Sequence, residues 1–515
     1  MSDAAWWRTG AVYQIYPRSF QDSNGDGIGD LPGLRSRLDW VEQLGVRAVW
    51  LSPVHPSPQA DFGYDVADYC DVDPVFGNVA DMDHLIADCH ARGLKVILDG
   101  VFNHTSDQHD WFTASRADKT NDKRDWYIWR DTVPNNWKSI FGGTAWTKDA
   151  ATGSYYLHSF LPAQPDLNWR NPEVVDAVLD VLRFWFERGV DGFRLDVFNS
   201  YLKHPDLPSN PRRWHPGALA YGYVGQHHVH DRDQPDLPKV LGQMRALADE
   251  YGAVLIGETL DERFRYDRAT DFVGDDQLHM AFHFALLHSR WTSKKLASAI
   301  RRQLDALPKD GWPTWVLSNH DFQRHPTRWG GGDERAKAAA IIALTLPGTP
   351  FLYYGEELGM VEGRLKKADI VDPPGIRFWP IFKGRDGART PMQWTAEGGF
   401  TTGVPWLPMN PDIARRNAEA PQTASIVQTY RGLLALRHDN SALRNGTLIW
   451  PPADHADVLS WQRVNANDRV RVLVNTVQRS VLVPGESGKE VLWSTAGVTD
   501  VREPLAPNEG RVVRV

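Results

Sequence analysis

The amino-acid sequence predicts an α/β fold: a (β/α)8 TIM barrel with an inserted subdomain after strand 3 and a C-terminal antiparallel β-sandwich domain. Short apolar runs alternate with helical segments through most of the chain, which is typical of a parallel barrel. One connection, residues 104–169, is too long for a simple loop and is rich in aromatic residues, Gly and Asp. Val-rich runs replace the helical pattern near the C-terminus. We therefore assign the barrel to residues 1–103 and 170–441, the inserted subdomain B to 104–169 and the β domain to 442–515.

Eight apolar runs are predicted as barrel strands because each is short and is bounded by turn-forming or polar residues. Such runs suit strands that are covered on both faces. The fourth run alternates, so Arg194 and Asp196 are expected to point to the same side. In chain order the runs span residues 11–16, 46–51, 94–98, 192–196, 253–257, 279–284, 314–317 and 350–353.

Helices are predicted between these strands, where apolar residues recur at the helical period. Pro172 opens one of them, and Gly189 lies just beyond its end, as is typical of helix boundaries. A last helix precedes the β domain, whose clearest strand candidates are residues 470–474 and 511–515. The predicted helices span residues 34–44, 80–92, 172–188, 237–251, 293–307, 334–346 and 425–437.

The composition disfavours several classes of partner. The net charge is −8, and Lys and Arg are scattered, which argues against nucleic acid. No stretch approaches 18 consecutive apolar residues and the N-terminus has no signal-peptide pattern, so we expect no membrane association. Cys70 and Cys89 are the only cysteines, which excludes a disulfide framework and favours a reduced, cytoplasmic setting. We expect a small, neutral partner; the 22 tryptophans suit sugar stacking, although most should be core.

Residues 22–30 carry oxygen ligands at the spacing of a calcium loop. Gly27 suits the sharp turn, but Gly33 stands where an EF-hand has its glutamate. We predict a lone structural Ca²⁺ site, with Mg²⁺ as the other candidate ion; the alternative is a metal-free turn rich in Asp and Asn. The expected ligands are Asp22, Asn24, Asp26, the carbonyl of Ile28, and Asp30.

Polar residues end four of the predicted strands, and in a barrel such residues meet at one mouth. Singly, they often only cap the next helix or turn. No Cys/His pair at metal-ligand spacing, nucleophilic-serine elbow or phosphate-binding glycine loop competes at these positions. Together they indicate glycoside cleavage by paired carboxylates. The set comprises Asp99, Asn103, His104, Arg194, Asp196, Glu258, Asn319, His320 and Asp321.

Four segments closely resemble, in order, the signature regions of the α-amylase superfamily, family thirteen of the glycoside hydrolases; they are residues 99–104, 192–199, 257–258 and 318–321. Three more are similar to its oligo-1,6-glucosidase and α-glucosidase branch; they are residues 13–20, 164–169 and 384–394. The resemblance covers nearly the whole chain and implies the barrel, a retaining mechanism and a carbohydrate substrate.

The resemblance also implies catalytic roles. Asp196 would be the nucleophile, Glu258 the general acid/base and Asp321 the carboxylate that binds sugar hydroxyls in the transition state. The residue chemistry agrees, because Arg194 favours the ionised form of Asp196, and repulsion from Asp321 should raise the proton affinity of Glu258. Because two inversions give net retention, the carboxyl groups of Asp196 and Glu258 are expected roughly 5–5.5 Å apart.

Further residues resemble those that bind the terminal glucose: Asp61, Tyr64, His104 and His320, with Phe160 facing the sugar and Arg385 pairing with Asp61. If Asp61 and Arg385 grip the far hydroxyls, the pocket is closed and cleavage is exo-acting on short substrates. The alternative for Arg385 is a structural ion pair with Asp386 or a barrel carboxylate. Glu357 is expected to contact the leaving sugar, or else to be a helix N-terminal carboxylate.

Val197 follows the expected nucleophile, and in the resembling branch Val at this position goes with acceptance of α-1,6 bonds. We predict a retaining exo-α-glucosidase, monomeric or homodimeric, that acts on disaccharides and short oligosaccharides. A glucosyltransferase or sucrose/maltose isomerase that uses the same intermediate is the alternative. A non-catalytic binding relative is disfavoured because all three carboxylates are present.

Overall fold

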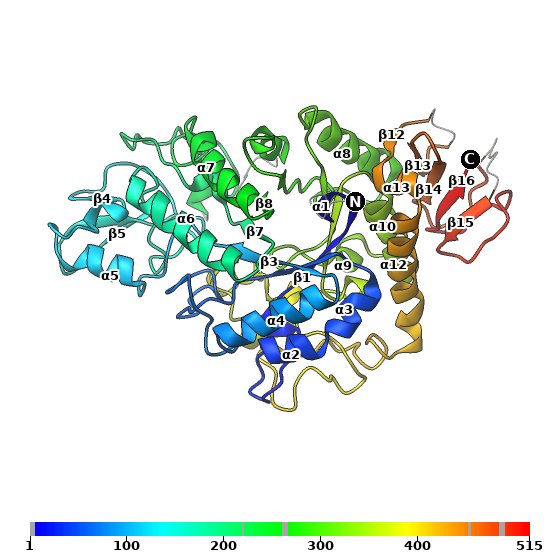
Figure 1. Ribbon diagram of the computed structural model, residues 1–515, viewed down its shortest axis with the longest axis horizontal. Helices are drawn as coiled ribbons and strands as arrows, with labels where there is room; N and C mark the ends of the chain where they lie inside the picture. The colour runs from blue at the N-terminus through cyan, green and yellow to red at the C-terminus, as the bar shows by residue number, and fades with distance from the viewer. Residues whose placement is uncertain (1–5, 219–220, 260–265, 452–454, 484–489) are drawn as a thin grey trace.

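The computed structural model describes residues 6–218, 221–259, 266–451, 455–483 and 490–515. Its eight-stranded sheet has only parallel neighbours, and helices surround it (Figure 1), so the predicted barrel is confirmed. The hydroxyl of Thr314 donates to the carbonyl of Ala281 (2.9 Å) and connects the two end strands. In hydrogen-bonded order the strands are β10 Thr314–Val316, β11 Thr349–Tyr353, β1 Val12–Ile15, β2 Ala48–Leu51, β3 Lys95–Gly100, β7 Gly192–Leu195, β8 Val254–Gly257 and β9 Met280–Ala281.

Local sequence sets where the helices begin. Asn78 caps α4 through a reciprocal capping box, Asn171 precedes the Pro172 that opens α6, and Thr292 caps α8. The helices are α1 Trp6–Thr9, α2 Leu31–Ser36, α3 Leu38–Leu44, α4 Val79–Ala91, α5 Asp110–Ala117, α6 Pro172–Glu187, α7 Leu237–Glu250, α8 Ser293–Ala306, α9 His325–Trp329, α10 Gly332–Thr345, α11 Pro373–Phe378, α12 Pro421–Asp439 and α13 Ser441–Asn445.

Two elements differ from the sequence prediction. Residues 34–44 belong to two helices, because Arg37 between α2 and α3 has a non-helical backbone (φ −110°, ψ 7°). The predicted strand 279–284 is reduced to β9. The ring of Phe282 lies 5.5 Å from Trp50 and 4.8 Å from Phe351, so this run is apolar because it fills the barrel interior rather than because it extends the strand.

The connection after β3 forms the predicted subdomain, which contains α5 and a three-stranded antiparallel sheet. The long loop after β7 braces it: Trp137 Nε1 donates to the carbonyl of Pro208 (2.9 Å), and Gln226 Nε2 donates to the carbonyl of Asn136 (2.7 Å). This region therefore lies against the barrel mouth. In spatial order its strands are β4 Trp129–Arg130, β6 Tyr155–Leu157 and β5 Trp146–Lys148.

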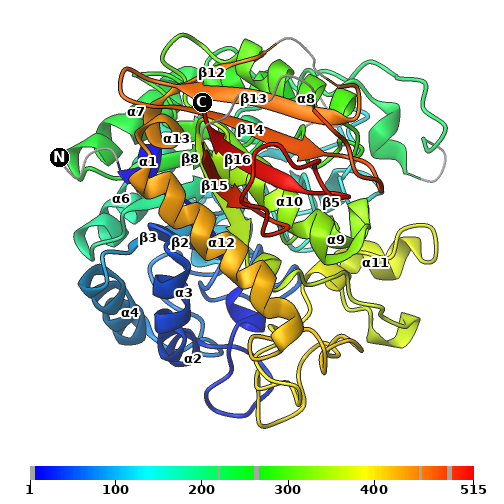
Figure 2. The same ribbon diagram turned by 90° about the vertical axis from the view of Figure 1, so that its right-hand side faces the viewer.

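The C-terminal region forms the predicted antiparallel β domain, beside α10 and α12 (Figure 2). Lys337 Nζ on α10 donates to the carbonyl of Thr495 (3.0 Å) across this interface. On the outer face Val481 and Leu505 form a short bridge, so among the described residues the second layer of the sandwich is this bridge rather than a full sheet. In order the strands are β12 Thr447–Ile449, β13 Val458–Val464, β14 Arg469–Asn475, β16 Gly510–Arg514 and β15 Glu490–Ser494.

In the described ranges, no helix combines the length and apolar character needed to cross a membrane.

Both cysteines are free, and burial raises the pKa of Cys70 to about 11 and that of Cys89 to about 12. Both thiols are therefore protonated at neutral pH and act as small apolar groups.

Arg437 on α12 caps the C-terminal end of α10. Its guanidinium donates to the carbonyls of Leu344, Leu346 and Gly348, and the residue is 1% exposed. We expect Arg437→Met to lower the free energy of unfolding by about 3 kcal/mol, because buried carbonyls lose their donors. Urea unfolding measures this, with Arg431→Met on the same helix as control. A loss no larger than that of the control would contradict the capping role.

Candidate active site

The polar strand ends meet around a cavity of about 250 Å³ at the carboxyl ends of the barrel strands. Asp196 follows β7, Glu258 follows β8 and Asp321 lies in the loop after β10. The other polar lining residues are Asp61, Tyr64, His104, Gln164, Thr259, His320 and Arg385. The apolar lining residues are Ile140, Phe141, Phe160, Val197, Phe284 and Phe322.

Arg194 binds carboxylates that follow or end three neighbouring strands. Its Nη1 donates to Asp99 Oδ1 and Asp196 Oδ1, both at 2.7 Å, and its Nη2 donates to Glu258 Oε2. These groups meet because Arg194 pairs in register with Asp99 on β3, while β7 also pairs with β8. The residue is only 1% exposed, so solvent screens these ion pairs little. One planar guanidinium therefore orients both Asp196 and Glu258.

The chain turns sharply after Asp196. Val197 has φ 36° and ψ 39°, a left-handed conformation that is rare for a β-branched residue. Backbone strain of this kind is typical of functional sites. Here the turn ends β7 and places Asp196 and Val197 side by side in the cavity wall.

Two carboxyl groups in the cavity have pKa values that are shifted in opposite directions. Burial raises the pKa of Glu258 well above its ordinary value; Arg194 opposes this rise, while Asp196 and Asp321 add to it. The expected repulsion from Asp321 is therefore present, but burial is the larger cause. Burial alone would also raise the pKa of Asp321, but His320, Arg385 and Arg389 lower it well below its ordinary range. One carboxyl thus keeps its proton while another stays ionised, as acid–base catalysis requires.

His320 lies between Gln14 and Tyr64 as a neutral imidazole. Burial lowers its pKa to about 3. Its Nδ1 is 2.8 Å from the side-chain nitrogen of Gln14, which can only donate, so the hydrogen of His320 resides on Nε2. Nε2 lies 2.6 Å from the Tyr64 hydroxyl, which donates to Asp99 Oδ2 (3.2 Å). His320 and Tyr64 are thereby oriented together at the cavity.

Arg385 lines the cavity beside Asp61. Its Nη2 lies 2.7 Å from Asp61 Oδ1 and 2.6 Å from Asp372 Oδ1, and its Nη1 lies 3.3 Å from Asp321 Oδ1. The expected pair with Asp61 is present. In the described part of the chain Arg385 forms no ion pair with Asp386, whose carboxylate accepts two backbone amides.

Subdomain B forms one side of the cavity, where it contributes His104, Phe160 and Gln164. The rings of His104 and Phe160 are 5.0 Å apart, and Gln164 Nε2 donates to the carbonyl of Tyr64 (3.0 Å). Four polar residues of the site were not singled out from the sequence: Gln164, Thr259, Asp372 and Arg389. Arg389 follows Arg385 within one recognised segment, which was a usable signal, whereas nothing local marks Asp372 as its partner.

Glu357 lies outside the cavity. Its Oε1 accepts hydrogen bonds from the Tyr13 hydroxyl (2.7 Å) and Trp40 Nε1 (3.0 Å), and the residue is 1% exposed. The predicted contact with a leaving sugar is therefore wrong, because this carboxylate is enclosed by core side chains. Its place in the first turn of the 3-10 helix Glu356–Leu358 agrees with the alternative that we gave.

The predicted calcium loop lies away from the cavity. Asp22 accepts hydrogen bonds from loop amides and from the Thr401 hydroxyl, and Asp30 caps α2. The oxygen atoms that the loop offers come from carboxylates, a side-chain amide and a backbone carbonyl, a set that suits a hard cation. Within the described ranges no group of three or more His, Cys, Asp or Glu side chains is arranged to hold a metal ion. The donor chemistry fits Ca²⁺, and the bound ion stays a prediction.

Comparison with known proteins places this site in context. The sequence matches the family described as "Alpha amylase, catalytic domain" over residues 14–446. A probable alpha-glucosidase of Rhizobium meliloti (strain 1021) is 45% identical over 92% of this chain and 90% of that protein. An oligo-1,6-glucosidase of Heyndrickxia coagulans is 39% identical over 92% of this chain and 93% of that protein.

Solved structures extend the comparison to enzymes that transfer or rearrange glucosyl groups. XgtA, described as an alpha-glucosyl transfer enzyme, has a TM-score of 0.91 at 40% identity and covers 99% of both chains. Trehalulose synthase MutB has a TM-score of 0.90 at 34% identity, covering 99% of this chain and 100% of that one. MutB mutants are known in complex with sucrose, isomaltulose and glucose.

Proposed function

This chain belongs to the alpha-amylase family, family thirteen of the glycoside hydrolases, and from this premise we propose that it is a retaining, exo-acting α-glucosidase. It is a glycoside hydrolase of the α-glucosidase/oligo-1,6-glucosidase type. We propose that it releases the non-reducing terminal α-glucosyl unit of disaccharides and short oligosaccharides. The observation that carries this proposal is the attachment of Asp196 and Glu258 to one guanidinium, Arg194, at the cavity.

In the first step, a carboxylate oxygen of Asp196 attacks the anomeric carbon. Glu258, whose raised pKa favours the protonated acid, gives its proton to the glycosidic oxygen as the carbon–oxygen bond breaks. The leaving sugar departs and the glucosyl unit remains esterified to Asp196. Asp321, ionised beside His320, accepts hydrogen bonds from sugar hydroxyls and favours the positive charge that develops on the ring.

In the second step, Glu258 is ionised and takes a proton from water. The water oxygen attacks the anomeric carbon and releases Asp196, so glucose leaves with its original configuration. Arg194 then donates again to the freed Asp196 carboxylate.

Exo action is supported by the ion pair of Arg385 and Asp61, which both line the cavity. We propose that this pair binds the far hydroxyls of the terminal glucose and so stops the chain from continuing past it. The cavity volume of about 250 Å³ is also small beside the ~300–1,000 Å³ of typical ligand pockets. One glucosyl unit therefore fits, with the rest of the substrate leaving through the mouth. Val197 in the wall favours acceptance of α-1,6 bonds.

A glucosyltransferase or isomerase is the second candidate function. The likeness to XgtA and to MutB favours it, because their printed descriptions name glucosyl transfer and trehalulose synthesis. Both functions share the Asp196-linked intermediate and differ in whether water or a sugar attacks it.

The deciding experiment is product analysis by NMR with maltose, isomaltose and sucrose, each at low and high concentration, together with dextran. We expect α-glucose as the first product from the short substrates and little release from the interior of dextran. Initial release of β-glucose would refute the retaining mechanism. New disaccharides in excess of glucose would favour the transferase or isomerase.

The raised pKa of Glu258 predicts the alkaline limb of the pH profile. The proton is present below this pKa and is lost as pH rises through it, so kcat/KM on maltose should fall at alkaline pH. The pKa of Asp321 is lowered, so this group stays ionised and should not contribute that limb. In Glu258→Gln the residual activity on p-nitrophenyl α-glucoside should lack the limb. An unchanged limb in this variant would assign it to another group.

We also propose that the loop of residues 22–30 binds Ca²⁺, with Mg²⁺ as the alternative ion. Its ligands would be Asp22, Asn24, Asp26, the carbonyl of Ile28, and Asp30. Removal of the ion with EDTA should lower the melting temperature by a few degrees, since 1 kcal/mol corresponds to roughly 2–4 °C in a domain of about 150–250 residues and to less in a longer chain. Restoration by Ca²⁺ alone, or equally by Mg²⁺, identifies the ion, and Asp26→Asn should lose the response. An unchanged melting temperature would favour the metal-free turn.

A further inference from the structure

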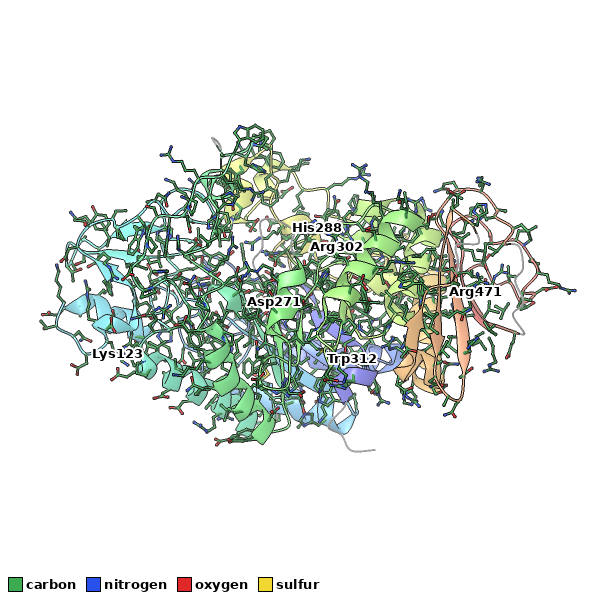
Figure 3. All side chains as sticks on the ribbon, turned by 90° about the horizontal axis from the view of Figure 1, so that it is seen from above. Lys123, Asp271, His288, Arg302, Trp312 and Arg471 are labelled. Carbon is green, nitrogen blue, oxygen red and sulfur yellow. The ribbon has the colours of Figure 1, made fainter. Side chains whose placement is uncertain are left out.

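A second cavity, of about 480 Å³, lies beside α8. The loop after β9 contributes His288 and Arg290 to its lining, and α8 contributes Lys295, Ser298 and Arg302. Figure 3 labels His288 and Arg302, one from each of these two segments. None of the described residues that line this cavity, which we call the basic cavity, is acidic.

Three exposed cations contribute to the basic cavity. Arg290, Lys295 and Arg302 are exposed, and none of them forms an ion pair within the part of the chain that the structure describes. Burial, together with Arg328, lowers the pKa of His288 to about 4, so this imidazole is neutral at neutral pH. Among the described residues, three positive charges at this cavity therefore have no anionic partner, and a concave surface concentrates their potential on whatever enters.

The first turn of α8 places positive charge at the positive end of the helix dipole. It contains Lys294 and Lys295 and no acidic residue. A helix N-terminus favours anions rather than cations. Residues 295, 298 and 302 also share one face of α8, because they are three and four positions apart. Positive side chains at a helix N-terminus lower the stability of the helix. Such an unfavourable arrangement, facing a cavity, is expected where a ligand supplies the missing negative charge.

We propose that the basic cavity binds the phosphate group of a phosphate-bearing ligand. The planar guanidinium groups of Arg290 and Arg302 can each donate two parallel hydrogen bonds to phosphate oxygens, and Lys295 and the Ser298 hydroxyl supply further donors. The volume accepts more than the anion alone, so a phosphorylated sugar and inorganic phosphate are both suitable sources.

The basic cavity adjoins the active site through one aromatic wall. The ring of Phe322 lies 5.1 Å from His288, which lines the basic cavity, and 5.7 Å from Phe284, which lines the active site. Phe322 itself lines the active site and directly follows Asp321. A ligand in the basic cavity therefore lies next to the wall that faces the bound substrate.

Isothermal titration calorimetry with the full chain tests the proposal. Inorganic phosphate, glucose 6-phosphate and glucose are titrated separately at an ionic strength held constant with NaCl. We expect at least one of the two phosphate compounds to bind with a Kd of about 1 mM or lower, and the double variant Lys295→Gln/Arg302→Gln to weaken this binding at least about tenfold. Tighter binding of glucose 6-phosphate identifies a phosphorylated sugar as the ligand, whereas equal binding identifies free phosphate.

Lys294→Gln is the matched control, because Lys294 is exposed on the same turn of α8 but does not line the basic cavity. It should bind phosphate as the wild type does. Hydrolysis of p-nitrophenyl α-glucoside without phosphate should be unchanged in all variants, which separates this result from the proposed function. Binding of neither phosphate compound, or an equal loss in Lys294→Gln, would overturn the proposal.

Discussion

Asp196→Asn is expected to lower kcat/KM by about 10⁴-fold or more on every α-glucoside, because the amide cannot form the glucosyl ester. Asn has the shape of Asp and still accepts a hydrogen bond from Arg194, so folding should be retained. Initial rates with p-nitrophenyl α-glucoside measure the loss, and circular dichroism checks the fold. Asp206→Asn, on the exposed loop after β7, is the control and should be fully active.

Glu258→Gln separates the acid from the nucleophile. On maltose, whose leaving group needs a proton, the loss should be about 10²–10⁴-fold. On p-nitrophenyl α-glucoside it should be much smaller in the first step, because nitrophenolate leaves without a proton. Asp196→Asn should show no such dependence on the leaving group. Comparable losses on both substrates in Glu258→Gln, or substantial activity in Asp196→Asn, would refute the assignment of roles.

Arg194→Lys is expected to reduce kcat by about 10³-fold, although it keeps a positive charge. A single ammonium group cannot bind Asp99, Asp196 and Glu258 together, so the two reacting carboxyl groups lose their common support. Arg194→Met should in addition cost roughly 3–5 kcal/mol of unfolding free energy, because buried carboxylates lose their cation. Kinetics and urea unfolding measure the two effects.

Arg188 provides the control for this substitution. It forms a partly exposed ion pair with Asp83 (2.8 Å), so Arg188→Lys should alter both kinetics and stability little. If Arg194→Lys kept more than a tenth of the wild-type kcat, orientation by the guanidinium fork would not be the main contribution of this residue.

The barrel and its catalytic mouth could be predicted from local patterns. Apolar runs that alternate with helices predict a parallel sheet, eight such runs favour a closed barrel, and a barrel brings all its strand ends to one rim. Asp99, Arg194 and Asp196 could therefore be grouped before any contact was known. The short β9 escaped this reasoning, because residues that fill a barrel interior are as apolar as residues in a strand.

Individual partners were harder to predict than the site. Arg385 has Asp386 beside it in the sequence, yet in addition to the expected Asp61 it binds Asp372. Glu357 was expected at the leaving sugar, yet it bonds to Tyr13 in the core. Adjacency in the chain does not predict the partner of a long side chain, because such a side chain can reach several acceptors of similar chemistry.

The sequence by itself determined which residues end the barrel strands, which of them carry charge, and which family has the same residues at these positions. The pair of Arg385 with Asp61 was expected from the family resemblance alone, and the tertiary structure decided the remaining partners. The hydrogen bond between Tyr13 and Glu357 spans 344 positions and that between Arg385 and Asp61 spans 324, so no local pattern encodes either. Their geometry is set by packing of the whole barrel, because a buried carboxylate is stable only where a donor from another element reaches it.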